Sequence, residues 1–202
     1  MQPVVVFDLG KVLVDFDYTI AAKKVAARSA ITIENLHDFL SSSPLLVQLE
    51  SGLLTPHQFY TEIQKATGFT GSADEFTNYF ADIFAPMPPM VELHAALRKR
   101  QIPTYIFSNT NDIAIGHIRR QYPFFGNFDG YILSYEVGAM KPQAKIYEAL
   151  EKLCGRRGAE IFYIDDRLEN VQAGAARGWQ IVLHESPDAT RAALQKFLSM
   201  PI

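Results

Sequence analysis

The hydrophobic residues of this chain gather in short, nearly continuous runs that are separated by longer amphipathic stretches. Unbroken apolar runs of this kind are typical of parallel strands that are covered on both faces, whereas half-exposed strands alternate apolar and polar positions. The runs are Val4–Phe7, Thr104–Phe107, Gly130–Leu133, Ile161–Ile164 and Gln180–Leu183. The pattern therefore predicts a sheet whose strands lie far apart in the sequence.

The stretches between the later runs carry apolar residues at helical spacing. In Met90–Arg100, for example, Val91, Leu93 and Leu97 fall on one helical face. The other helical patterns are Ala114–Gln121, Lys145–Leu153 and Val171–Arg177. Strands that alternate with helices are typical of βαβ units. We therefore expect an α/β fold with a parallel sheet and helices on both of its faces.

The segment 18–84 interrupts this alternation, because it contains several helical patterns and no convincing strand. The proline-rich stretch Ala85–Pro89 follows it and is typical of a stiff linker. We expect an α/β core formed by residues 1–17 and 85–202, with 18–84 as an inserted helical cap. An insert at this point would lie over the carboxyl ends of the strands and could act as a lid.

One helix boundary inside the insert is well marked. Gly52 can close a helix, because glycine readily adopts the left-handed conformation found after a last turn. Thr55, Pro56 and Gln58 then match an N-cap, a first-turn proline and a capping-box glutamine. These residues predict a new helix that begins at Pro56.

Composition narrows the class of protein. Of the 202 residues, 48% are hydrophobic and 20% are charged, and the net charge of −3 comes without a basic stripe. Nucleic acid and membrane surfaces are therefore not expected partners. We expect neither a signal peptide nor a membrane-spanning helix. Cys154 is the single cysteine, which fits a reducing environment and a cytoplasmic location.

Polar residues that can bind or attack a phosphate follow three of the strand patterns. Asp8 follows the first run, and a carboxylate at such a position can act as a nucleophile at phosphorus. Ser108 and Asn109 come after the second run and lead into a helix, where backbone amides favour an anion. Lys141 lies after the third run and before a proline. Taken singly, each has a plainer interpretation as a turn, capping or surface residue.

Two adjacent carboxylates follow the fourth run. Asp165 and Asp166 repel one another at the end of an apolar strand, and Asn170 lies four residues beyond Asp166. A hard cation relieves such repulsion, and Mg²⁺ is typically held by one or two carboxylates, waters and phosphate oxygens. Because the carboxyl ends of parallel strands meet at one edge, these groups and Asp8 are expected to form one site.

These motifs, in this order, resemble the haloacid dehalogenase-like superfamily over the whole core. The matching segments are Phe7–Val12, Ser108–Thr110, Gly138–Pro142, Ile164–Asn170 and Ala173–Trp179. The resemblance implies a Rossmann-like core with a helical cap inserted after the first motif. Within the superfamily, the chain is most similar to small phosphatases that open with Asp-Leu-Gly-Asn/Gly-Val, among them sugar-1-phosphate phosphatases.

The resemblance also implies a Mg²⁺-dependent phosphatase of a small phosphorylated metabolite that works through an aspartyl-phosphate. The implied catalytic nucleophile is Asp8. The implied phosphate-binding residues are Ser108, Asn109 and Lys141. The implied metal ligands are Asp8, the backbone carbonyl of Gly10, and Asp166. Asp165 and Asn170 are expected beside the metal ligands rather than on the ion. The expected assembly is a monomer or a small homo-oligomer.

The chain departs from the family pattern at Gly10, where most phosphatases of this family have a second Asp that acts as general acid and base. The reaction could proceed without this Asp if the substrate has an acidic leaving group. Alternatively, another acid, such as Asp15 or Asp17, could reach the site and take its place. A third explanation is a catalytically weak, phosphometabolite-binding protein. Metal-independent 2-haloacid dehalogenases also lack this Asp, but the Asp165–Asp166 pair disfavours a metal-free site for an anionic substrate.

The expected cap offers less to interpret. Arg28 and Glu50 are each compatible with a position facing the substrate and with a solvated helix face. The histidines show no spacing that suggests a metal site, and most aromatic residues of the cap are expected to serve in packing.

Overall fold

The computed structural model describes residues 2–202; residue 1, which belongs to the expected core segment 1–17, lies outside the described residues. The core of the fold is a parallel sheet with the strand order β5-β4-β1-β6-β7. The strands are β1 (Val4–Phe7), β4 (Thr104–Ser108), β5 (Gly130–Leu133), β6 (Ile161–Asp165) and β7 (Gln180–Leu183). All five apolar runs are thus strands, and β4 and β6 each extend one residue further, to Ser108 and Asp165.

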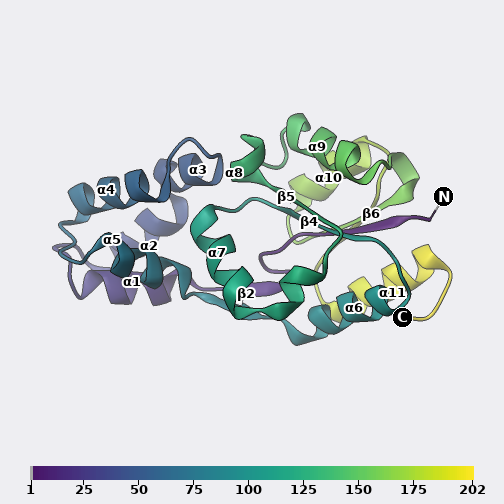
Figure 1. Cartoon of the computed structure of the whole chain (residues 1–202), viewed down its shortest axis with the longest axis horizontal. Coiled ribbons are helices and arrows are strands. Elements are labelled where there is room, and N and C mark those ends of the chain that lie inside the picture. Colours follow the sequence, from purple (N-terminus) through teal and green to yellow (C-terminus); the bar gives the residue numbers. More distant parts are fainter. Residues whose placement is uncertain (1) are drawn as a thin grey trace.

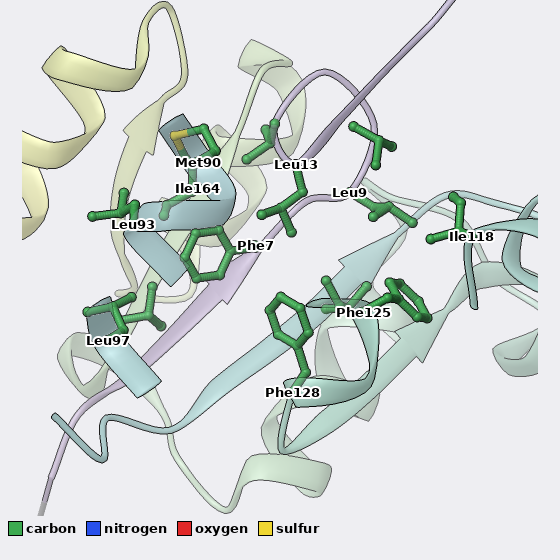
Figure 2. Close-up of a cluster of buried hydrophobic side chains, with 14 of the residues drawn as sticks. Phe7, Leu9, Leu13, Met90, Leu93, Leu97, Ile118, Phe125, Phe128 and Ile164 are labelled. Atoms are coloured by element: carbon green, nitrogen blue, oxygen red, sulfur yellow. The ribbon is translucent and has the colours of Figure 1, made fainter. Parts of the chain in front are cut away.

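Helices cover both faces of the sheet, as the unbroken apolar strands predict (Figure 1). Val5 and Phe7 point to one face and share a hydrophobic cluster with α6, α7 and α11, part of which is drawn in Figure 2. Val4 and Val6 point to the other face and pack with α9 and α10. The helices are α6 (Pro88–Lys99), α7 (Asp112–Gln121), α9 (Ala144–Cys154), α10 (Leu168–Ala176) and α11 (Pro187–Leu198). This is the Rossmann-like core expected from the sequence.

Five helices follow one another between β2 and β3 and lie to one side of the core, where they form the helical cap (Figure 1). Their own hydrophobic cluster is centred on the aromatic rings of Phe59, Phe76 and Phe80. The helices are α1 (Tyr18–Ala26), α2 (Ile33–Ser42), α3 (Pro44–Glu50), α4 (Pro56–Thr67) and α5 (Ala73–Ala81). The capping box of Thr55 and Gln58 is present at the start of α4.

A short antiparallel ribbon, which the sequence pattern does not reveal, joins cap and core. It pairs β2 (Val14–Phe16) with β3 (Phe84–Pro86). The prediction of Ala85–Pro89 as a stiff linker was therefore wrong: its first two residues belong to β3 and its last two begin α6. A proline is accepted here because a two-stranded ribbon has free edges, where a missing N–H breaks no ladder.

The remaining elements connect strands and helices of the core. They are the single-turn helix α8 (Ser134–Val137) and the 3₁₀ helices η1 (Pro123–Asn127) and η2 (Gly158–Glu160). Among residues 2–202, no helix combines the length and the apolar character that crossing a membrane requires.

Candidate active site

The carboxyl ends of the central strands open into a cavity of about 230 Å³ between core and cap. Asp8 directly follows β1, and Asp166 directly follows β6, so the parallel register brings them to the same edge. The core residues that line the cavity are Asp8, Gly10, Lys11, Asn109, Met140, Lys141, Asp166, Arg167 and Asn170. From the ribbon and the cap come Phe16, Tyr18, Ser41, Leu46 and Glu50.

Lys141 pairs with the carboxylates of both Asp8 and Asp165 at the centre of the site. Its Nζ lies 2.9 Å from Oδ1 of Asp8 and 2.6 Å from Oδ2 of Asp165. It also donates a hydrogen bond of 2.9 Å to the carbonyl oxygen of Phe107 in β4. Burial by itself acts to lower the pKa of Lys141, but the two carboxylates outweigh it and the pKa is raised. Lys141 is therefore a fixed positive charge beside Asp8.

Asp165 is fully buried and is held by several donors. It accepts hydrogen bonds from the hydroxyl of Tyr163 at 2.5 Å, from Nδ2 of Asn170 at 3.0 Å and from the backbone N–H of Arg167 at 2.9 Å. Burial acts to raise the pKa of Asp165, but Lys141 and these hydrogen bonds outweigh it, so the pKa is lowered. Asp165 thus positions Lys141 and the loop that carries Asp166.

The two carboxylate oxygens of Asp8 differ: Oδ1 has protein partners and Oδ2 has none among residues 2–202. Oδ1 accepts a hydrogen bond of 2.7 Å from the backbone N–H of Leu9 and pairs with Lys141. Oδ2 has no hydrogen-bond partner among residues 2–202. Burial raises the pKa of Asp8 above its ordinary value, Asp165 adds to this effect, and Lys141 opposes it. Asp8 is therefore a carboxylate that needs further positive charge to stay ionised.

The donor set fits a divalent cation. Carboxylate oxygens of Asp8, Asp165 and Asp166 lie within 4.8 Å of one another. Burial raises the pKa of Asp166, and the negative charge of Asp165 raises it further. Gly10, whose backbone carbonyl is the expected third ligand, borders the same cavity. Three carboxylates face a single buried lysine here, and a hard cation with oxygen ligands, such as Mg²⁺, would balance that charge.

Ser108 and Asn109 lie beside this cluster, and their side chains differ in what they contact. Asn109 fixes the Lys141 loop: its Nδ2 donates to the carbonyl of Lys141 at 3.0 Å, and its Oδ1 accepts from the Lys141 N–H at 2.7 Å. Ser108 is buried and borders a smaller adjoining cavity of about 60 Å³ together with Gly10. The structure thus gathers the expected phosphate-binding residues around Asp8, and their roles stay predictions.

Other candidates from the sequence lie outside the cavity. Asp15 pairs with Lys11, and the side chain of Asp17 caps the first turn of α1. Arg28 pairs with Glu75 inside the cap. Neither Asp15 nor Asp17 is in a position to replace the acid that is absent at Gly10.

The cavity is also lined by charged residues to which the sequence pattern assigned no definite role. Lys11 and Arg167 border it from the core, and Glu50 reaches it from the end of α3. Lys11 and Arg167 belong to the matching segments Phe7–Val12 and Ile164–Asn170, which is the one local signal that could have drawn attention to them. For Glu50 the sequence left a solvated face and a substrate-facing position equally open, and the structure places it at the cavity.

Comparison with known proteins agrees with this architecture. The sequence profile of haloacid dehalogenase-like hydrolases matches residues 3–178. The chain belongs to the haloacid dehalogenase-like hydrolase family. The expected family and the expected class of enzyme, a hydrolase, are thereby confirmed.

Two relatives to which the chain is similar are a phosphatase and a nucleotidase. A sesquiterpene phosphatase of Aspergillus oryzae is 28% identical, and the match covers 86% of this chain and 85% of that protein. A pyrimidine 5'-nucleotidase of Escherichia coli is also 28% identical, with 90% of this chain and 88% of that protein covered. The two relatives act on chemically different phosphate esters.

A solved structure of similar architecture is that of a HAD family enzyme from Bacteroides thetaiotaomicron in complex with magnesium and inorganic phosphate. The two structures superpose with a TM-score of 0.80 at 24% identity, over 90% of this chain and 93% of that chain. This likeness confirms the fold, a Rossmann-like core with a helical cap.

Proposed function

We propose that this family member is a Mg²⁺-dependent phosphatase that hydrolyses a small phosphorylated metabolite through an aspartyl-phosphate on Asp8. The observation that carries the proposal is the arrangement of Asp8, Lys141 and Asp166 around one cavity at the carboxyl edge of the sheet. The phosphatase relatives support the reaction class. The volume of about 230 Å³ lies just below the usual range of small-molecule sites and favours a small substrate.

Asp8, the carbonyl of Gly10 and Asp166 would hold the metal. Bound Mg²⁺ would supply positive charge to the phosphate oxygens and to the converging carboxylates. The ammonium of Lys141 adds a second, permanent charge beside Asp8. Since Lys141 is buried and fixed by Asp165, this charge needs no rearrangement when the phosphate enters.

The reaction then follows from the position of Asp8. A carboxylate oxygen of Asp8 attacks phosphorus in line, the bond from phosphorus to the leaving oxygen breaks, and that oxygen takes up a proton. Water next attacks the phosphorus of the aspartyl-phosphate, which releases inorganic phosphate and restores the Asp8 carboxylate.

The test is phosphate release from a panel of phosphorylated metabolites by the wild-type protein and by Asp8→Asn. We expect turnover with Mg²⁺, none in EDTA, and none with Asp8→Asn at either condition. Metal-independent phosphate release, or an unaffected Asp8→Asn variant, would contradict the proposal. Halide release from a 2-haloacid in EDTA would instead support a dehalogenase.

A further inference from the structure

Glu50 brings a carboxyl group from the cap into the cavity that contains Asp8. It is the last residue of α3 and lines the main cavity, and it also borders the smaller cavity beside Ser108. Among residues 2–202, its side chain has no hydrogen-bond partner and forms no ion pair. A half-buried carboxyl group without a protein partner is available to a bound substrate.

The core fixes the position of Glu50 directly. Its backbone carbonyl accepts a hydrogen bond of 2.6 Å from the hydroxyl of Ser134, at the start of α8. The same Ser134 oxygen accepts a hydrogen bond of 2.9 Å from the backbone N–H of Thr110. Two residues after Glu50, a Cβ atom on Gly52 would lie 2.2 Å from the carbonyl oxygen of Tyr135. The end of α3 is therefore packed tightly against α8, which follows β5.

The surroundings of Glu50 suit a group that exchanges protons near neutrality. Burial raises the pKa of Glu50 to about 7, while Arg167 and Lys141 act in the opposite direction. Groups with a pKa near the working pH are the most effective general acids and bases. The titratable and charged side chains that share the cavity with Glu50 are Asp8, Lys11, Tyr18, Lys141, Asp166 and Arg167.

Position 10 lacks the acid, and a side chain there would require Phe16 to move. A Cβ atom on Gly10 would lie 2.9 Å from Cε1 of Phe16, which belongs to β2 of the ribbon and borders both cavities. The nearby acids Asp15 and Asp17 are held by Lys11 and by the start of α1. Among the acidic residues described, Glu50 is thus the one that the cap directs to the cavity.

We propose that Glu50 is the general acid and base of the phosphatase reaction, in the role that Gly10 cannot fill. In the first step the Glu50 carboxyl gives its proton to the leaving oxygen as the bond from phosphorus to that oxygen breaks. In the second step the Glu50 carboxylate takes a proton from the water that attacks the aspartyl-phosphate. Both steps balance, because Glu50 ends protonated and Asp8 ends as a free carboxylate. This inference rests on the proposed function.

The inference also concerns the class of substrate. Protonation matters most for an ester of an aliphatic alcohol, since an alkoxide is a poor leaving group. An aryl ester such as p-nitrophenyl phosphate needs no proton, because its leaving group is already a stable anion. The two kinds of ester therefore separate protonation of the leaving group by Glu50 from every other role of the residue.

The test compares kcat/KM of Glu50→Gln for the best alkyl phosphate of the panel and for p-nitrophenyl phosphate. We expect a loss of about 10²–10⁴ for the alkyl ester and of less than about tenfold for the aryl ester. The wild-type profile for the alkyl ester should fall above about pH 7, and this limb should disappear in the variant. Glu62→Gln, a matched change at a cap residue paired with Lys65, should leave both values unchanged.

An equal loss for both esters would overturn the role in proton transfer, as would no loss for either. Absence of phosphate release by the wild-type protein from both esters would instead overturn the proposed phosphatase function. A second measurement needs no turnover: the carboxyl carbon of Glu50 is followed by NMR against pH and assigned with Glu50→Gln. A midpoint near 7 supports the inference, and a midpoint near the ordinary value of about 4.3 contradicts it.

Discussion

Nζ of Lys141 lies 2.6 Å from Oδ2 of Asp165, and the two side chains are 1% and 0% exposed. With Asp8 at 2.9 Å, the same ammonium offsets two buried carboxylates. We therefore expect Lys141 to contribute to the stability of the fold as well as to the charge of the site.

Lys141→Met should destabilise the metal-free protein, because it leaves buried carboxylates without a counter-charge. Loss of one partner of a buried pair costs roughly 3–5 kcal/mol. Urea unfolding in EDTA measures the loss, and the double variant Lys141→Met/Asp165→Asn should recover part of it. Lys65→Met removes an exposed pair and should cost less than about 1 kcal/mol. Equal losses for Lys141→Met and Lys65→Met would contradict the assigned role.

Gly52→Ala should destabilise the protein more than Gly68→Ala. Both glycines have positive φ, +70° and +67°, so both substitutions carry the strain of about 1 kcal/mol that a side chain meets there. A Cβ atom at position 52 would also lie 2.2 Å from a backbone oxygen, whereas at position 68 its nearest neighbour is 3.5 Å away. Thermal unfolding of the two variants measures the difference, and equal shifts would show that the junction of α3 and α8 is not tightly packed.

His94 should make the protein less stable as the pH falls. It is buried, its Nε2 lies 3.1 Å from Oγ1 of Thr104, and its ring stacks on Phe128 at 3.8 Å. Burial lowers the pKa of His94 to about 4, with a smaller contribution from Arg98. Below the ordinary histidine pKa of about 6.5, the unfolded chain therefore binds a proton that the folded chain does not.

The resulting stability is complete above about pH 6.5 and is lost as the pH falls to about 4, by roughly 3 kcal/mol at most. Urea unfolding over this range, for wild type and His94→Gln, measures the difference between the two proteins. We expect that difference to shrink as the pH falls. A constant difference would contradict a neutral, buried His94.

Mg²⁺ should stabilise the folded protein through Asp166. A ligand that binds the folded state alone adds about 2.7 kcal/mol at a concentration one hundred times its Kd. Thermal unfolding with increasing Mg²⁺ should show the shift for wild type and lose it for Asp166→Asn. Asp188→Asn, a matched change at an exposed residue of α11, should keep the shift. A shift of the same size in Asp166→Asn would exclude this carboxylate as a ligand.

The sheet, and the cluster of carboxylates at its edge, could be predicted from the sequence for one physical reason. Buried parallel strands are marked by unbroken apolar runs, and the carboxyl ends of such strands lie at one edge of the sheet. Asp8 and Asp166 could therefore be placed together from the sequence alone. The ribbon of Val14–Phe16 and Phe84–Pro86 could not be predicted in this way. Its strands are short, one contains a proline, and their pairing depends on residues about seventy positions apart.

The position of Glu50 could not be predicted from the sequence, for a similar reason. Nothing in the local pattern of α3 separates a carboxyl group that faces solvent from one that faces a cavity. The deciding contacts come from the hydroxyl of Ser134 and the carbonyl of Tyr135, which lie far away in the chain. A tertiary contact of this kind also crowds Gly10, because a Cβ atom there would lie 2.9 Å from the ring of Phe16.

The most direct measurement is a rapid acid quench during a single turnover of a phosphate ester that carries radiolabelled phosphorus. We expect label to appear on the protein, to be released by hydroxylamine as an acyl phosphate is, and to map to the peptide that contains Asp8. Asp8→Asn should remain unlabelled. Consumption of the ester without labelled protein at any time point, or labelling of Asp8→Asn, would contradict Asp8 as the phosphoryl acceptor.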